Sequence, residues 1–298
     1  MLRRILITGA KGQLGKALNQ KLKDKYDVVP TARKISKSEK CKDITTLDIA
    51  DRNAVQSIIY EIKPDIIINC AAYTDVDASE NNKDKAHAIN VIGLQNLILS
   101  SSNDTYLVQI SSDYVFDGYN GPYLEEDHTF PINYYGKTKL EAENILRGSR
   151  KNYLIIRSNV IYSEDLFCKS NFFAWVYKSL INEHAISVVN DQISNPTYVA
   201  HLAEAIYKCI TLRTQGIYHY GGDHYISRYE FALAIAEHFE LNINLIKPID
   251  TEELSENIPS YIARRPQNSG LKTYKIENEI GLSTYSTNYS LNKLKYLL

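Results

Sequence analysis

The sequence lacks the features that mark secreted, metal-binding, membrane and nucleic-acid-binding proteins. Its four cysteines, Cys41, Cys70, Cys168 and Cys209, are irregularly spaced without any Cys-x-x-Cys pair, so we expect neither a zinc site nor a disulfide framework. The formal net charge of -1 indicates no partner among nucleic acids or anionic membranes. No apolar run reaches membrane length and no signal peptide precedes the first expected strand, which predicts a soluble cytoplasmic protein.

The chain is well supplied with hydrophobic residues, and at its start with glycine. The hydrophobic fraction of 44% suffices for one or two domains with a large core. A strand at Ile5–Ile7 leads into the turn Thr8–Gly15 and then an amphipathic helix. Gly9 permits the tight turn, Gly12 lets the backbone approach a pyrophosphate, and Gly15 lets helix and strand pack closely. Because a helix N-terminus also attracts phosphate, this stretch predicts a dinucleotide site.

The second expected strand, Tyr26–Thr31, ends without the acid that usually binds the ribose 2′-hydroxyl of NAD. Arg33 and Lys34 follow instead. A guanidinium can hold a 2′-phosphate through two hydrogen bonds, so Arg33 favours NADPH, with NADH still possible. The alternative is a basic loop that contacts only solvent.

Two further strands are expected to reach the same edge of the sheet. The stretch Thr45–Ile49 places the Asp48 carboxylate to accept from an adenine amine, with Ile49 packing on the ring. Asp51 caps the next helix, which ends near Lys63. The apolar run Asp65–Ala72 is typical of a central parallel strand, and its last residues are small enough for a cofactor to lie against the backbone.

A hydroxyl and a Tyr-x-x-x-Lys pair follow the fifth expected strand, Thr105–Ser111. Ser112 would stand at the carboxyl edge of the sheet, where open α/β sheets bind ligands. Reduction of a ketone needs a proton donor beside the carbonyl oxygen, and Tyr135 can supply it. Lys139 lies one helical turn away, so its charge is expected to lower the pKa of the Tyr135 phenol. The alternative is two neighbouring residues on an ordinary amphipathic helix.

Strands and helices alternate through Arg157, which predicts an α/β fold with a doubly wound parallel Rossmann-type sheet. Beyond that residue the alternation weakens and indicates a smaller α/β substrate-binding lobe at the C-terminal end. We expect the cofactor domain to span 1–160 with a return segment at about 190–215. The second lobe is expected to comprise 161–189 and 216–298. No cluster of carboxylates has metal-ligand spacing, so no catalytic metal is expected.

Five separated stretches contain further motifs. They are Cys70–Glu80 (CAAYTDVDASE), Ser111–Gly118 (SSDYVFDG), Tyr135–Glu143 (YGKTKLEAE), Asp191–Thr197 (DQISNPT) and Ala263–Leu271 (ARRPQNSGL). Together they resemble the dTDP-4-dehydrorhamnose reductase family of the extended short-chain dehydrogenase/reductases. The resemblance implies NADPH-dependent reduction of the 4-keto group of a nucleotide-linked 6-deoxyhexose.

The resemblance also assigns site residues. Tyr135 would be the acid, Lys139 would hold the nicotinamide ribose, and Ser112 would bind the substrate oxygen. Together with the glycine turn, the residues expected at the cofactor are Gly9, Lys11, Gly12, Gln13, Leu14, Gly15, Arg33, Asp48, Ile49, Ala71, Ala72, Tyr73, Asn90, Ser111, Tyr135 and Lys139. Those expected beside the sugar are Thr74, Val76, Asp113, Tyr114 and Val160, and those on the diphosphate side are Asn171, Gln192 and Arg265.

Differences from the sequence motifs of related enzymes limit the reactions that we expect of this chain. Similar dehydratases carry Asp-Glu after the catalytic hydroxyl and similar epimerising enzymes carry a cysteine, whereas this chain has Asp113-Tyr114, which predicts reduction alone. Val160 stands where the family often has a tryptophan. Two alternatives stay open: a non-catalytic NADP-binding subunit resembling the β subunit of methionine adenosyltransferase, or a reductase of another keto-sugar nucleotide. A homodimer is a family expectation only.

Overall fold

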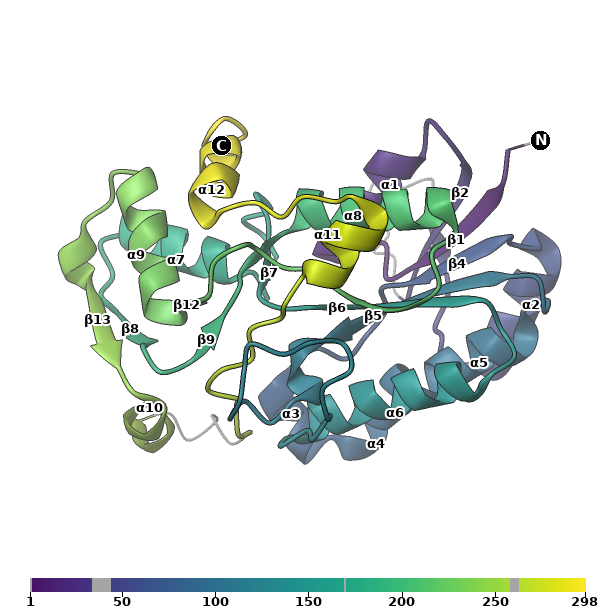
Figure 1. Cartoon of the computed structure of the whole chain (residues 1–298), viewed down its shortest axis with the longest axis horizontal. Coiled ribbons are helices and arrows are strands. Elements are labelled where there is room, and N and C mark those ends of the chain that lie inside the picture. Colours follow the sequence, from purple (N-terminus) through teal and green to yellow (C-terminus); the bar gives the residue numbers. More distant parts are fainter. Residues whose placement is uncertain (1, 34–43, 169, 258–262) are drawn as a thin grey trace.

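A seven-stranded parallel sheet forms the centre of the molecule (Figure 1). The structure is a computed structural model that describes residues 2–33, 44–168, 170–257 and 263–298. The strands in spatial order are β11 (Gly216–His219), β6 (Tyr153–Ser158), β5 (Tyr106–Ser112), β4 (Ile66–Asn69), β1 (Arg4–Thr8), β2 (Asp27–Ala32) and β3 (Thr45–Thr46). The order reverses between β1 and β4, which makes the carboxyl edge there the expected ligand site.

Helices cover both faces of this sheet (Figure 1). One face carries α1 (Gln13–Leu22) and α8 (Val199–Leu212), while α11 (Tyr274–Ile280) packs beside β11. The opposite face carries α2 (Arg52–Ile62), α5 (Gly93–Ser100) and α6 (Tyr134–Gly148). Short helices α3 (Val76–Asn81) and α4 (Lys83–His87) lead through a π-helical turn, η1 (Ala88–Ile92), into α5.

Alternating side chains of each strand supply the two cores. Ile5 and Ile7 of β1 face the α1/α8 side, whereas Leu6 faces the α2/α5/α6 side. Successive strand residues point to opposite faces of a sheet, so a strand covered on both sides is apolar throughout. This explains why the run at Ile66–Asn69 could be assigned to a central strand, and the doubly wound α/β fold predicted from the sequence is confirmed.

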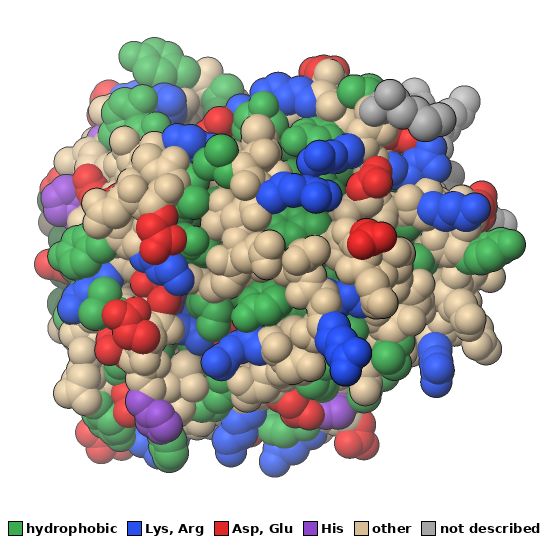
Figure 2. Space-filling model, turned by 45° about the vertical axis from the view of Figure 1, so that its right-hand side comes forward, with side chains coloured by type: hydrophobic (Ala, Val, Ile, Leu, Met, Phe, Trp, Pro, Cys, Tyr) green, Lys and Arg blue, Asp and Glu red, His purple; other side chains and the backbone are tan. Residues whose placement is uncertain are grey.

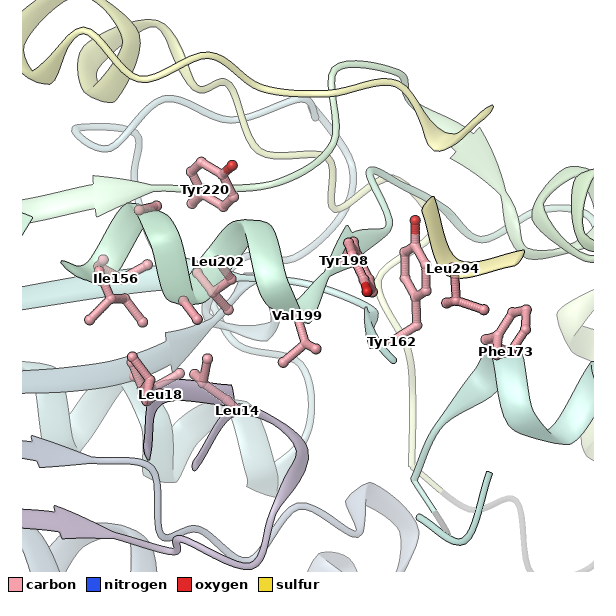
Figure 3. Close-up of a cluster of buried hydrophobic side chains, with 14 of the residues drawn as sticks. Leu14, Leu18, Ile156, Tyr162, Phe173, Tyr198, Val199, Leu202, Tyr220 and Leu294 are labelled. Atoms are coloured by element: carbon pink, nitrogen blue, oxygen red, sulfur yellow. The ribbon is translucent and has the colours of Figure 1, made fainter. Parts of the chain in front are cut away.

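The second lobe continues the α1/α8 core. It contains α7 (Phe172–Ile181), α9 (Arg228–His238), α10 (Thr251–Asn257) and α12 (Thr287–Lys295), the strand pairs β7–β10 (Ile161–Tyr162, Thr197–Tyr198), β9–β12 (Ile193–Ser194, Ile226–Ser227) and β8–β13 (Ile186–Val189, Ile246–Ile249), and the 3-10 turn η3 (Ile243–Leu245). Figure 3 shows Leu14 and Leu18 of α1 near Val199 and Leu202 of α8, with Tyr162 and Phe173 farther toward this lobe. The two parts therefore share one hydrophobic core.

The sequence-based domain boundary at residue 215 needs correction. Strand β11 pairs in parallel with β6 and so belongs to the main sheet. The main sheet therefore extends four residues beyond that boundary, to His219. Its sequence, Gly216–His219, is short and lacks the continuous apolar run that identified the other strands. The stretch assigned as a strand at Thr45–Ile49 is also shorter, because β3 comprises only Thr45–Thr46.

The surface has no single dominant charge on the face shown in Figure 2, where acidic, basic and apolar side chains are interspersed. Within the described ranges, no helix has both the length and the apolar character needed to cross a bilayer. The charge-rich run Lys34–Lys42 and Cys41 lie outside the described residues. The three described cysteines, Cys70, Cys168 and Cys209, are free thiols.

Candidate active site

A cavity of about 680 Å³ opens at the carboxyl edge of the main sheet. It extends from the glycine turn after β1, past the ends of β4 and β5, to Arg228 in the second lobe. Of the residues expected to bind cofactor or substrate, those that line it are Gly9, Lys11, Gly12, Gln13, Leu14, Gly15, Arg33, Asp48, Ile49, Ala71, Ala72, Tyr73, Thr74, Val76, Ser111, Ser112, Asp113, Tyr114, Tyr135, Lys139 and Val160. Its volume is in the range of small-molecule sites.

The glycine turn is packed so closely that side chains would not fit. Gly9 has a φ of +66°, and a Cβ there would lie 2.7 Å from the Ala71 nitrogen. A Cβ on Gly15 would lie 2.7 Å from the Ala10 Cα. Helix α1 then begins at Gln13, with no side-chain cap and no acid in its first turn. Its N–H groups and dipole therefore face the cavity without a competing anion.

The expected adenosine end lies beside β2 and β3. Arg33 is exposed at the rim of the cavity, and Lys34 falls outside the described residues. The Asp48 carboxylate accepts from the Ala50 N–H at 3.0 Å, which shapes the turn before α2. Asp51 caps α2 as predicted, since its side chain accepts from the N–H groups of Asn53 and Ala54.

Ser112, Tyr135 and Lys139 meet at the other end of the cavity. Ser112 is the last residue of β5, and the other two lie one turn apart on α6, which begins at an Asn133 N-cap. The Lys139 ammonium is 4% exposed and donates to the Ile110 carbonyl oxygen at 2.6 Å. The Tyr135 ring lies edge-on to Tyr114, with 5.9 Å between ring centroids. A hydroxyl, a phenol and an ammonium thus surround one region of the cavity.

Burial sets the pKa values of this group. Burial raises the pKa of the Tyr135 phenol, the Asp113 charge raises it further, and a hydrogen bond with Ser112 opposes both. Burial lowers the pKa of Lys139 to about 8, against the Glu143 charge, which raises it. The prediction that Lys139 lowers the pKa of Tyr135 is therefore wrong for this structure, because desolvation of the phenol outweighs the other influences.

Asp113 is a buried carboxyl that follows Ser112 and lines the same end of the cavity. It is 3% exposed, and its two oxygens accept from the Ser112 hydroxyl at 2.9 Å and the Ser269 hydroxyl at 2.6 Å. Burial raises its pKa to about 6, and both serine hydrogen bonds oppose that rise. Because Ser269 belongs to the C-terminal segment, Asp113 also ties the second lobe to the end of β5.

A buried polar network supports the site from behind. The Arg157 guanidinium of β6 donates to both oxygens of Glu143 on α6, at 2.9 and 2.7 Å, and the two side chains are 2% and 0% exposed. The Ser111 hydroxyl donates to the same carboxylate at 2.5 Å. Glu143 lies one helical turn from Lys139, so this network links the main sheet to α6 beside Lys139.

Asn90 supports the cavity indirectly, through its hydrogen bond with Tyr73. Its amide oxygen accepts from the Tyr73 N–H at 2.7 Å, and its amide nitrogen donates to the Thr138 hydroxyl at 2.8 Å. Asn90 does not itself line the cavity, whereas Tyr73 does. The π-helical turn η1, where the Asn90 side chain is placed, thus fixes the loop after β4.

Three residues expected on the diphosphate side do not line the cavity. Asn171 is 2% exposed, and its amide donates to the carbonyl oxygens of Ser163 and Asp165 at 2.7 and 3.0 Å. Gln192 donates to the Thr251 hydroxyl at 2.9 Å. The Arg265 guanidinium forms an ion pair with Asp77, and one of its contacts is 2.7 Å. These side chains stabilise loops and the junction of α3 with the C-terminal segment, and the structure does not support their assignment to a ligand.

Sequence reasoning missed several residues that line the cavity. Among them are Arg228, the first residue of α9, and Phe172, the first residue of α7, which come from the second lobe. The only local signal at Arg228 is the Ser-x-x-Glu capping pattern around it, Ser227 to Glu230, which places a helix start but not a ligand.

Comparisons with known proteins agree with this geometry. The model of the RmlD substrate binding domain family matches residues 3–295. A dTDP-4-dehydrorhamnose reductase from Aggregatibacter actinomycetemcomitans is 34% identical, with 98% of each chain covered. Methionine adenosyltransferase 2 subunit beta from Bos taurus is 32% identical over 92% of this chain and 82% of its own length. The crystal structure of a dTDP-4-dehydrorhamnose reductase from Bacillus anthracis in complex with NADP has 35% identity, a TM-score of 0.89 and 100% coverage of both chains. The chain therefore belongs to the RmlD substrate binding domain family.

Proposed function

We propose that this protein is an NADPH-dependent reductase of the 4-keto group of a nucleotide-linked 6-deoxy-4-ketohexose. The observation that carries the proposal is one continuous cavity with a glycine turn at one end and Ser112, Tyr135 and Lys139 at the other. The names of the relatives from Aggregatibacter actinomycetemcomitans and Bacillus anthracis support dTDP-4-dehydrorhamnose as the first substrate to test.

The cavity fits a dinucleotide cofactor. The uncapped start of α1 and the close-packed Gly9 and Gly15 leave a cradle for a pyrophosphate, and Ala71 and Ala72 leave the backbone after β4 open to a ligand. Arg33 lines the rim of the cavity, and we propose that it binds the 2′-phosphate. When bound, the reduced nicotinamide supplies the hydride for the carbonyl carbon.

The chain itself supplies the proton and the binding of the oxygen. The raised pKa of Tyr135 keeps its phenol protonated at neutral pH, so it can donate to the carbonyl oxygen as negative charge develops there. The Ser112 hydroxyl holds the same oxygen. The buried ammonium of Lys139, which lines the same end of the cavity, is proposed to hold the nicotinamide ribose beside Tyr135.

The direct test is loss of NADPH absorbance at 340 nm with a panel of 4-keto-sugar nucleotides, beginning with dTDP-4-dehydrorhamnose. We expect turnover with at least one member, and a fall of about 100-fold or more for Tyr135→Phe with cofactor affinity nearly unchanged. Tyr134→Phe is the matched control, since Tyr134 is the neighbouring phenol on α6 and does not line the cavity. Equal rates for the two variants would reject Tyr135 as the acid.

The second candidate function is a non-catalytic NADP-binding regulatory subunit. The similarity to methionine adenosyltransferase 2 subunit beta from Bos taurus favours it. The complete set of Ser112, Tyr135 and Lys139 around the cavity favours an enzyme. A regulatory subunit would bind NADPH and show no turnover on the whole panel, and that result would select the second candidate.

We propose that the protein binds a sugar nucleotide and no nucleic acid. We also propose that it is cytoplasmic and forms a homodimer. The formal net charge of -1 supports the proposal that no nucleic acid is bound, and the one face drawn in Figure 2 carries acidic and basic side chains together. Light scattering after size-exclusion chromatography tests the dimer, and a monomer mass at micromolar concentration would reject it.

A further inference from the structure

The substrate end of the cavity contains a cation whose backbone is firmly fixed. Arg228 follows the Ser227 N-cap of α9, where the Ser227 hydroxyl accepts from the Glu230 N–H at 3.0 Å and the Glu230 carboxylate accepts from the Ser227 N–H at 2.7 Å. The Arg228 N–H donates to the Gln192 carbonyl oxygen at 3.1 Å. Such reciprocal capping holds the first turn of a helix in one conformation. The Arg228 side chain therefore extends into the cavity from a rigid base.

The guanidinium packs among aromatic side chains and has no carboxylate partner in the described part of the chain. It lies over the Phe172 ring, 5.4 Å from the centroid, and its charge and a hydrogen bond lower the pKa of the Tyr114 hydroxyl against a larger rise from burial. No ion pair joins Arg228 to any described residue. A half-buried guanidinium without an anion can gain strongly from one that a ligand brings.

The Asp113 carboxylate, which feels the Arg228 charge, already has two hydrogen-bond donors. The Arg228 charge lowers the pKa of Asp113 against a larger rise from burial. The two Asp113 oxygens, however, accept from the hydroxyls of Ser112 and Ser269 at 2.9 and 2.6 Å. Asp113 therefore forms no ion pair with Arg228, which lines the cavity. By contrast, the Arg265 cation is paired with Asp77 outside the cavity lining.

We propose that Arg228 binds the diphosphate of the sugar-nucleotide substrate through its guanidinium fork. The inference rests on the proposed function and names the residue that anchors the nucleotide half of the substrate. Guanidinium and phosphate match in geometry through two parallel hydrogen bonds.

The position of Arg228 relative to the proton donor supports a phosphate over other anions. Tyr114 contacts both groups: its hydroxyl shares a hydrogen bond with Arg228, and its ring lies edge-on to that of Tyr135. In a hexose the 1-phosphate is attached across the ring from the 4-position, whereas a 6-carboxylate is attached next to it. A 4-keto group held at Tyr135 thus leaves the phosphate near Arg228.

The test measures binding without turnover. Calorimetry on the NADP-loaded protein compares dTDP and UDP with thymidine and uridine, for the wild type, Arg228→Gln, Arg228→Lys and the control Arg147→Gln. Arg147 is exposed in the last turn of α6 and does not line the cavity. We expect Arg228→Gln to weaken the diphosphates about 10- to 100-fold and the nucleosides less than twofold. Arg228→Lys should lose less, because it keeps the charge and loses the fork.

The results that would overturn the inference about Arg228 can be distinguished from one another. Equal weakening of diphosphates and nucleosides by Arg228→Gln would mean that the residue only shapes the pocket, and this overturns the inference. So would unchanged diphosphate affinity, or a wild type that binds neither dTDP nor UDP. Unchanged NADP affinity in Arg228→Gln shows that the variant is folded. A protein that turns over no keto sugar but binds dTDP through Arg228 would reject the reductase and keep this inference.

Discussion

Replacing Glu143 by glutamine removes the only charge that directly pairs with Arg157 among the described residues. The guanidinium would remain 2% exposed, and its other neighbours cannot replace the carboxylate. The Arg157 contacts at 3.3 Å are with the Glu125 carbonyl oxygen and the His219 ring. Burial and the Arg157 charge lower the pKa of His219 well below its usual value, so that ring stays neutral.

The expected cost follows from burial of an unpaired charge. Removing one partner of a buried ion pair typically destabilises a protein by about 3–5 kcal/mol. The glutamine amide keeps one acceptor oxygen and presents an NH2 group in place of the other, so at least one of the two Arg157 hydrogen bonds is lost with the charge. Against a total stability of about 5–15 kcal/mol, the fall in melting temperature is on the order of 10 °C.

Urea unfolding followed by circular dichroism measures this change. Glu141→Gln is the matched control, because Glu141 lies on the same helix with its side chain 50% exposed and should cost no more than about 0.5 kcal/mol. The double variant Glu143→Leu/Arg157→Met should recover most of the loss, since a buried pair can be replaced by apolar side chains at little cost. If Glu143→Gln costs no more than Glu141→Gln, the reasoning about the buried pair is refuted.

Three further predictions concern the cofactor end and the buried acid. Arg33→Ala should weaken NADPH by about tenfold or more and leave NADH nearly unchanged in a fluorescence titration; equal weakening would show that Arg33 does not contact the 2′-phosphate. Gly15→Ala should weaken both cofactors and destabilise the protein, because its Cβ would lie 2.7 Å from the Ala10 Cα; normal affinity would contradict the close packing. The pKa of Asp113 is raised from 3.8 to about 6, so the folded state binds the extra proton and stability from this group is lost as pH rises from about 4 to 6. Asp113→Asn should remove a slope worth about 3 kcal/mol across that window, and an identical slope in both proteins would contradict the burial argument.

Sequence reasoning succeeded where local pattern determines structure. The Asp51 cap and the apolar run at Ile66–Asn69 depend on neighbours a few residues away, and both were assigned correctly. It failed where the interacting residue is distant in the chain. Arg265 pairs with Asp77, 188 positions away, so no local pattern indicates that the Arg265 charge is paired. The prediction for the pKa of Tyr135 failed for a related reason, since the burial of its phenol cannot be read from its spacing to Lys139.

The place of β11 at the edge of the main sheet has a consequence for biosynthesis. The glycine turn leaves the ribosome first, yet the sheet beside it is incomplete until His219 has been made, about three quarters of the way along the chain. Until then β6 has an open edge with unpaired backbone groups. Translation of the intervening segment therefore sets the time during which the nascent chain is exposed to aggregation.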